Sequence, residues 1–218
     1  MKLLFIAGDY WHSKELLERE LAFLKDLGHE IDFVEDAKDI VTMELIRKYD
    51  EVVIAKGNAL TSANQHPWFE KGTTVLPVSG YEEYVKGGGS LLILHAGASF
   101  NKNDCQEMTE FIGVSFIEHP LQCRVDISIA LPAHPIAENL APFTLSQDEH
   151  YFIERTETDG EVVLEGTSHA GTQPACIARE MGKGRLCILT PGHNALVFKT
   201  EGFRNALVSC IEWTAFKK

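Results

Sequence analysis

The chain has 218 residues, with 20 Lys and Arg against 32 Asp and Glu, so its formal net charge is −12. A folded chain of this length buries about 70% of the surface that its unfolded form exposes, which removes the need for a disulfide or metal staple. The acidic balance, with a pI near 5.2 and no basic run, disfavours nucleic acids and anionic membrane surfaces as partners.

The sequence gives no sign of export or membrane insertion. The apolar start at residues 1–7 ends at Gly8 and Asp9, too early for a secretory leader, and no apolar stretch approaches the ~18 residues of a transmembrane helix. The five cysteines are odd in number and form no C-x-x-C pair, which indicates reduced, mostly structural thiols. We therefore expect a cytoplasmic protein, with residues 1–218 forming one domain.

The first half of the chain alternates strand and helix signals. Apolar runs at residues 3–7, 31–34 and 51–55 predict three buried strands. A helix with three leucines on one face is expected between Ser13, its N-cap, and Gly28, and a second helix around residues 41–46. This order is typical of a parallel α/β sheet.

Residues 56–76 show no clear periodicity and are long for a connection, so a functional loop and a disordered one are both open. A short helix at 81–85 and a glycine break at 87–89 precede an apolar strand at 90–94. Further strands are predicted at 124–130, 151–154, 161–164, 176–179 and 185–189, with a hairpin turn at 181–184, and a final helix at 201–216. The later strands should decorate the edge of the parallel sheet as antiparallel neighbours.

His95 is the strongest candidate for chemistry. It directly follows the strand at 90–94 and precedes small residues, Ala96 to Ser99, that permit a tight turn. Open α/β folds bind ligands at the carboxyl ends of their strands. In hydrolases and amidotransferases with such a turn the residue is a Ser or Cys nucleophile; imidazole can instead be a base, an acid or a metal ligand. The alternative is a histidine that only bonds a neighbouring carbonyl.

Two further segments could contribute to the same site. His193 follows the strand at 185–189, so it should approach the histidine at the other strand end. The segment Asp148-Glu149-His150-Tyr151 carries four titratable side chains, and if it is extended at most one alternate pair faces a site. Glu149 is our choice to orient a histidine or act as base; a solvated acidic turn is the alternative.

Metal and sugar sites are weaker predictions. Zinc held by His95, His119 and His193 is a hypothesis based only on their placement at strand ends or in loops, because no standard zinc spacing is present. The segment after the first strand lacks the glycines of a dinucleotide fingerprint. Tyr10 and Trp11, next to His12, could form a ring-stacking wall for a sugar or another small polar ligand, with ordinary edge packing as the alternative.

Several motifs recur in one order over most of residues 80–216, and Gly8 and His12 fit the same pattern. They are residues 87–96 (GGGSLLILHA), Gly113 with His119-Pro120, His134-Pro135-Ile136 through Pro142-Phe143, Asp148-Glu149-His150-Tyr151, Gly182-Lys183-Gly184-Arg185, Gly192-His193, Phe203-Arg204-Asn205 and Ile211-Glu212-Trp213-Thr214. As a set they resemble the trehalose-utilisation, or ThuA-like, family.

The resemblance implies a flavodoxin-like, class I glutamine amidotransferase-like three-layer sandwich. Its central sheet would be mainly parallel with antiparallel edge strands, and the glutaminase cysteine would be lacking. The family positions carried over are His95, His119, Glu149 and His193, with Tyr151 and Arg185 in support. Together with the reading of the residues, this assigns as catalytic His95, His193 and Glu149, and as substrate-binding His12, Trp11, His119, Tyr151 and Arg185.

Two functions are open. The first is an enzyme of sugar utilisation, a hydrolase or isomerase that acts on a small carbohydrate or keto-sugar through histidine acid/base chemistry or a divalent metal cofactor. The second is a non-catalytic sugar-binding or regulatory module of the same fold. A residual amidotransferase would need Cys105 or Cys123, neither of which follows a strand directly at such a turn. A homodimer is also open, because many α/β domains self-associate.

Overall fold

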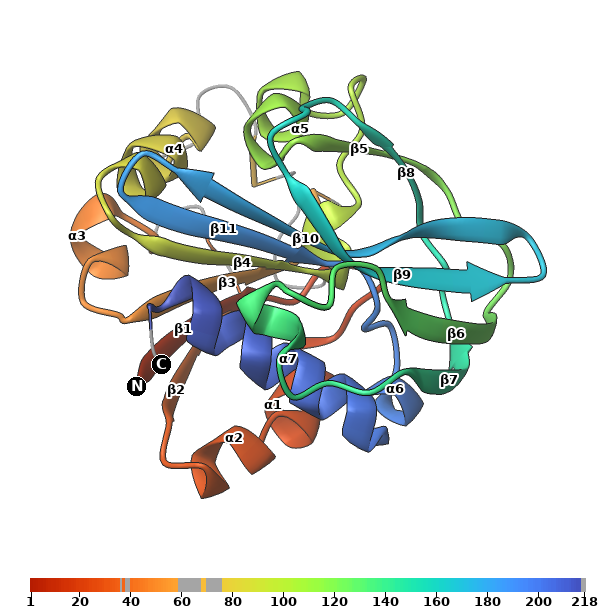
Figure 1. Ribbon diagram of the computed structural model, residues 1–218. Coiled ribbons are helices and arrows are strands. Elements are labelled where there is room, and N and C mark those ends of the chain that lie inside the picture. The colour runs from red at the N-terminus through yellow and green to blue at the C-terminus, as the bar shows by residue number, and fades with distance from the viewer. Residues whose placement is uncertain (36, 38–39, 59–67, 70–75, 217–218) are drawn as a thin grey trace.

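The computed structural model describes residues 1–35, 37, 40–58, 68–69 and 76–216. Five strands within these residues are parallel: β1 (Lys2–Ala7), β2 (Glu30–Val34), β3 (Glu51–Ala55), β4 (Ser90–Leu94) and β11 (Gly184–Leu189). Antiparallel strands extend the sheet: β6 (Cys123–Ile129), β7 (Phe143–Asp148), β9 (Glu161–Ser168) and β10 (Gly171–Met181). The order across this nine-stranded sheet is β2-β1-β3-β4-β11-β10-β9-β6-β7 (Figure 1). A separate antiparallel pair joins β5 (Val114–Glu118) to β8 (Phe152–Arg155).

Helices cover both faces of the large sheet (Figure 1). One face packs against α1 (Lys14–Glu20), α2 (Phe23–Asp26), α6 (Ala195–Lys199) and α7 (Glu201–Thr214). The opposite face packs against α3 (Met43–Ile46), α4 (Val78–Lys86) and α5 (Gln106–Ile112). Each face has its own buried apolar cluster, because the parallel strands are apolar on both sides. The predicted three-layer, mainly parallel α/β sandwich with antiparallel edge strands is confirmed.

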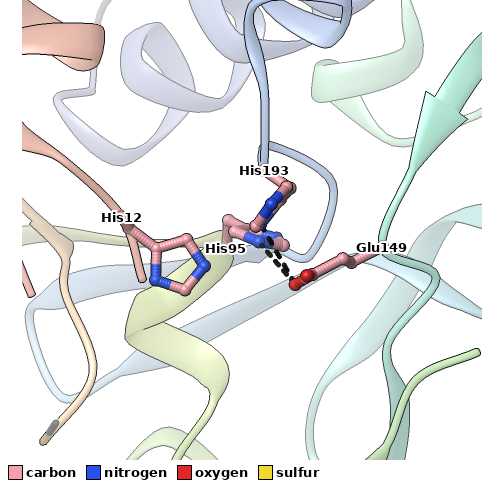
Figure 2. A group of neighbouring side chains, drawn as sticks. All are labelled: His12, His95, Glu149 and His193. Carbon is pink, nitrogen blue, oxygen red and sulfur yellow. Dashed lines mark ion pairs between the residues drawn. The ribbon is translucent and has the colours of Figure 1, made fainter. Parts of the chain in front are cut away.

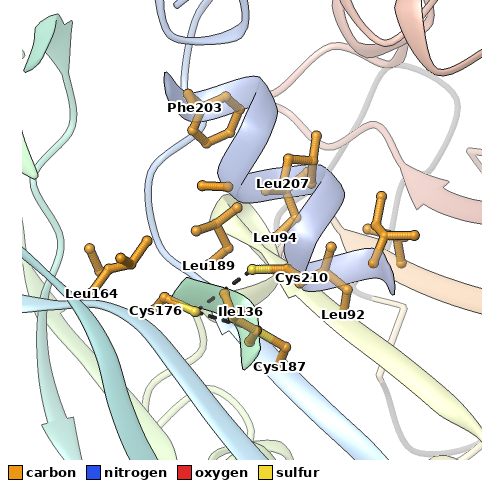
Figure 3. Close-up of a cluster of buried hydrophobic side chains, with 14 of the residues drawn as sticks. Leu92, Leu94, Ile136, Leu164, Cys176, Cys187, Leu189, Phe203, Leu207 and Cys210 are labelled. Carbon is orange, nitrogen blue, oxygen red and sulfur yellow. Dashed lines mark hydrogen bonds between the residues drawn. The ribbon is translucent and has the colours of Figure 1, made fainter. Parts of the chain in front are cut away.

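The core between β10, β11 and α7 contains three buried thiols (Figure 3). The Cys176 sulfur lies 3.6 Å from that of Cys187 and 3.7 Å from that of Cys210. Leucines from β4 and β11 and Ile136 lie around them (Figure 3). The thiols fill this space as small apolar groups, and all five cysteines are free, which agrees with the reduced thiols expected from the sequence.

The predicted elements differ from the observed ones mainly where the apolar signal is short. Ser13 caps α1 as expected, its Oγ accepting from the Leu16 N–H at 3.2 Å, but the expected long helix divides into α1 and α2. The helix expected at 41–46 is the single turn α3. The edge strand β7 was not predicted, because only Leu145 and Asp148 are buried along it. Most of the 56–76 loop, residues 59–67 and 70–75, lies outside the described part of the chain.

No helix in the described ranges is both long and apolar enough to cross a membrane.

Replacing the buried Glu51 with glutamine should raise the melting temperature at pH 8 by several degrees. Its carboxyl is fully buried, accepts a hydrogen bond from Thr214 Oγ1 at 2.8 Å, and has no partner for Oε1 among the described residues. Burial raises the pKa of Glu51 well above its ordinary value. The folded state therefore binds this proton more tightly than the unfolded state, and stability is lost as pH rises above the unfolded pKa of about 4.3.

Glutamine is neutral at every pH, so the gain should be largest at pH 8 and should shrink toward pH 4, as thermal melts across that range would show. An uncompensated buried polar group costs about 1–3 kcal/mol, which sets the scale of the gain. Glu212→Gln, an exposed change on α7, is the matched control and should shift the melting temperature little. A pH-independent difference, or a less stable Glu51→Gln protein at pH 8, would contradict this account of Glu51.

Candidate active site

Four titratable side chains meet where strands of the large sheet end (Figure 2). His12 lies in the segment after β1, His95 follows β4, His193 follows β11 by four residues, and Glu149 follows β7. One nitrogen of each imidazole and one oxygen of Glu149 lie within 4.8 Å of one another. The convergence of His95 and His193 expected from their strand-end positions is therefore present in the structure.

His95 begins a 3-10 turn (His95–Ala98). Its φ is 41°, a left-handed backbone conformation that residues other than glycine rarely adopt. Its Nδ1 donates to the Thr190 carbonyl oxygen at 2.7 Å, which leaves Nε2 as the nitrogen that faces the cluster. Burial lowers the pKa of His95 to about 4, although nearby Glu149 raises it, so the imidazole is neutral at pH 7. The histidine both bonds a neighbouring carbonyl and faces the site, so the two alternatives raised by the sequence are not exclusive.

His12 is fixed by the carboxylate of Asp9, at the end of β1. The His12 Nδ1 donates to Asp9 Oδ1 at 2.8 Å, and the same oxygen accepts from the backbone N–H groups of Trp11 and His12 at 2.8 and 2.9 Å. The other oxygen accepts from the Gly57 N–H at 2.7 Å. Burial would raise the pKa of Asp9, but the histidine and these N–H groups lower it below its ordinary value. Asp9 thus holds His12 with its Nε2 directed at the cluster.

His193 is positioned through the buried carboxylate of Asp148. The N–H groups of Gly192 and His193 donate to Asp148 Oδ2 and Oδ1 at 3.1 and 3.0 Å. Burial raises the pKa of Asp148 to about 7, against the lowering effect of those N–H groups. Gly192 has φ of 145° and its backbone lies so close to His95 that an added Cβ would come within 3.0 Å of the His95 Cβ. Only glycine fits there, which keeps the two histidines close together.

Glu149 is the shared partner of the surrounding histidines. Its Oε2 lies 3.1 Å from His193 Nδ1, 3.6 Å from His95 Nε2 and 3.7 Å from His119 Nε2. Burial alone would raise the pKa of Glu149, but His193 and His95 lower it well below the ordinary value, so the group is a carboxylate at pH 7. Burial lowers the pKa of His193 too, but Glu149 outweighs that effect and the net shift is upward.

Two cavities adjoin this cluster. The larger, about 570 Å³, has walls of both aromatic and polar side chains, and its lining is Asp9, Trp11, His12, Asn58, Ser99, Asp104, Phe116, His119, Glu149 and Tyr151. The smaller, about 190 Å³, reaches the cluster from the side of α1 and includes His12, His95 and His193 in its lining. Cys105 and Cys123, required by the amidotransferase alternative, line neither cavity.

Most of the predicted substrate-binding residues border this space. Tyr151 is buried and its ring stacks on His95 with centroids 4.4 Å apart, while Trp11 is 70% exposed at the cavity edge. His119 is exposed on the far side of Glu149, and its Nδ1 donates to the Pro120 carbonyl. Arg185 does not join them.

Arg185 lies at the opposite edge of the sheet, at the amino end of β11 beside Ser90. Its guanidinium donates to the Trp213 carbonyl at 2.8 Å and lies over the rings of Trp213 and Phe216. The predicted substrate contact for Arg185 is therefore not compatible with this arrangement, in which its side chain ties α7 to the sheet.

The family model described as ThuA, trehalose utilisation, matches residues 3–214. The chain belongs to the trehalose-utilisation family. No curated protein matches it. Among solved structures, ThuA-like proteins from Parabacteroides merdae and Bacteroides uniformis are 18% and 20% identical to it, with TM-scores of 0.76 and 0.74; the alignments cover 99% and 98% of this chain and 90% and 91% of those chains. A cytoplasmic protein from Salmonella typhimurium LT2 is 19% identical over 100% of both chains, with a TM-score of 0.70. These likenesses show a shared flavodoxin-like fold.

In this ThuA family member, several residues of the site carry no separate signal in the sequence. Asp9 and Thr190 act through hydrogen bonds to histidines, and Asn58, Asp104 and Phe116 line the cavity from loops and from the small sheet. Asp9 could have been suspected from its position at the end of a strand, beside His12. From the sequence, Asp148 was placed on the opposite face of its segment from Glu149 and was not selected. In the structure its carboxylate nevertheless holds the loop of His193 by accepting hydrogen bonds from two backbone N–H groups.

Proposed function

We propose that this ThuA family member acts on a small carbohydrate or keto-sugar in the larger cavity, with His95, His193 and Glu149 at the reacting atoms. The observation that carries the proposal is the cluster itself. Three imidazoles and one carboxylate converge within 4.8 Å beside a cavity of about 570 Å³. Such a concentration of buried and partly buried titratable groups in a concave site, with the pKa values of His95, Glu149 and His193 shifted, is typical of catalytic centres.

The lining of the cavity supports a sugar as the ligand. Trp11 and Phe116 offer aromatic surface to the apolar C–H groups of a sugar, while Asn58 and Asp104 offer hydrogen-bonding groups for hydroxyls. Asn58 Nδ2 already donates to Asp104 Oδ1 at 3.2 Å, which orders both groups. Membership of a family described by trehalose utilisation points to the same ligand class.

The chemistry of the cluster suits proton transfer at a carbon next to a carbonyl, or hydrolysis. His95 is neutral at pH 7 and presents the lone pair of Nε2, and Glu149 is ionised. Two roles are therefore open to the imidazoles: moving protons, and holding a metal ion that polarises a sugar oxygen.

A screen of sugars and keto-sugars, read both by thermal shift and by product formation, tests the proposal. We expect at least one compound to stabilise the protein and to be converted. Trp11→Ala should weaken its binding about tenfold, because a stacking ring is lost. Tyr10→Ala is the matched control, since Tyr10 is exposed beside Trp11 but lines neither cavity. Stabilisation without conversion would favour the non-catalytic binding module, and no stabilisation by any sugar would contradict the proposal.

We also propose a cytoplasmic location. The free state of all five cysteines suits a reducing compartment, and one protein of similar fold is described as cytoplasmic.

A further inference from the structure

Three buried imidazole nitrogens in the site have no hydrogen-bond partner among the described residues. They are His12 Nε2, His95 Nε2 and His193 Nδ1, and the last two lie at ion-pair distance, 3.6 and 3.1 Å, from the Oε2 of Glu149. The His95 side chain is only 3% exposed and that of His193 17%. A buried nitrogen without a hydrogen-bond partner costs about 1–3 kcal/mol of folding stability. Three such nitrogens at one point therefore indicate a ligand that all three share.

The other nitrogens of two of these rings are fixed in the way that metal-binding histidines require. His12 donates from Nδ1 to the Asp9 carboxylate, and His95 donates from Nδ1 to the Thr190 carbonyl. A histidine that binds a metal through one nitrogen almost always donates the other N–H to a carboxylate or a backbone carbonyl. These contacts place the proton on Nδ1 and leave the lone pair of Nε2 directed at the cluster.

We propose that His12 Nε2, His95 Nε2, His193 Nδ1 and Glu149 Oε2 bind one divalent transition-metal ion. Imidazole with one carboxylate suits zinc, iron, cobalt or nickel, whereas calcium and magnesium prefer sites built of oxygen. Ligand bonds of about 2.0–2.2 Å at tetrahedral angles separate neighbouring donor atoms by roughly 3.3 Å. The Glu149 oxygen lies 3.1 Å from His193 Nδ1 and 3.6 Å from His95 Nε2, close to that spacing.

A network of shared protons explains the arrangement less well. Glu149 Oε2 lies at ion-pair distance from His193 Nδ1, but the Nε2 atoms of His95 and His12 have no proton to share with it, because Nδ1 of each ring holds the proton. His12 Nε2 would then remain buried without a partner. One metal ion satisfies all three nitrogens and the carboxylate together.

This ligand set replaces the one suggested by the sequence, in which His119 was the third histidine. His119 lies 3.7 Å from Glu149 on the side of the larger cavity and is outside the group of converging donor atoms. Its Nε2 is therefore free to contact a ligand in that cavity. When bound, the metal would act as a Lewis acid toward an oxygen of that ligand.

Metal analysis of protein purified without a polyhistidine tag tests the inference without any sugar. We expect about one zinc, iron, cobalt or nickel ion per chain, or, for protein stripped with a chelator, tight binding of added Zn²⁺ and a raised melting temperature. Single changes to alanine at His12, His95 or His193, and Glu149→Gln, should each lower the affinity for Zn²⁺ at least tenfold. Asp9→Asn, which leaves all four ligands in place, should lower it about 10–100-fold.

Two control variants separate the proposed ligands from other histidines. His119→Gln changes a neighbour of Glu149, and His169→Gln changes an exposed loop histidine; both should keep the affinity of the unchanged protein. Circular dichroism confirms that each variant is folded. Less than a tenth of an equivalent of metal together with no response to added Zn²⁺, Fe²⁺, Co²⁺ or Ni²⁺ would overturn the inference, as would an equal loss of affinity in His119→Gln.

The metal site and the sugar proposal can fail separately. Stoichiometric metal in a protein that no sugar stabilises would support the metal site and contradict the proposal that the ligand is a sugar. Conversion of a sugar by protein shown to be free of metal would support the sugar proposal and contradict the metal site.

Discussion

Substitution of His95 by alanine should lower the turnover of a sugar substrate by about 10²–10⁴-fold while the domain stays folded. A positioned proton-transfer group contributes that much to a rate, and loss of a metal ligand would cost at least as much. His95 is the most buried of the clustered histidines, and its Nε2 is directed at Glu149. The measurement is kcat/KM for a sugar found to be converted, together with a melting curve.

The melting temperature should fall by only a few degrees: the variant loses one hydrogen bond to the Thr190 carbonyl and the stack on Tyr151, but it also removes a buried nitrogen, Nε2, that has no hydrogen-bond partner among the described residues. His95→Asn distinguishes the effect of backbone strain from the loss of the imidazole, because asparagine tolerates the left-handed conformation better than alanine. It should melt at or above the alanine variant and stay inactive. His169→Ala, in an exposed loop, should retain full activity. Turnover that survives in His95→Ala would exclude His95 from the reacting atoms.

Replacing Asp148 with alanine should reduce both stability and activity although Asp148 lines neither cavity. Its carboxylate accepts the N–H groups of Gly192 and His193, and both would be left without that partner. We expect a loss of about 2–6 kcal/mol in the free energy of unfolding, from about 1–3 kcal/mol for each group. A displacement of His193 by about 1 Å would also lower kcat/KM by about a hundredfold.

Denaturant unfolding measures the first effect, and kinetics well below the melting temperature of the variant measure the second. Asp126→Ala is the matched control, because Asp126 is an exposed carboxylate on β6 that bonds only side chains, Arg124 and Thr144, in the described structure. It should change stability by less than about 1 kcal/mol. Full activity in folded Asp148→Ala would show that Asp148 does not position His193.

The sequence was sufficient to predict the parallel half of the fold and much of the site. Apolar runs such as those of β1, β3 and β4 are buried on both faces, so they are visible without alternation. Because parallel strands end at one edge, His95 and His193 could be expected to meet there. The expected alternation of residues 148–151 is also present, because the alternate pair Glu149 and Tyr151 lines the larger cavity.

The remaining features depend on contacts that no local pattern reveals. His12 was assigned to substrate binding rather than to the cluster, because the side chain that Asp9 holds can be placed only once the order of β1, β3 and β4 in the sheet is known. Edge strand β7 buries too little apolar surface to produce a clear alternation. Arg185 shares a motif with residues of the family pattern, but its strand begins at the edge of the sheet opposite the site.

A crystal structure of the protein soaked with the sugar that gives the largest thermal shift tests the central claim most directly. The account predicts the sugar in the larger cavity, with a ring face against Trp11 or Phe116 and at least one oxygen within reach of the cluster formed by His12, His95, Glu149 and His193. A sugar bound elsewhere on the molecule, with none of its oxygens near these four side chains, would contradict it.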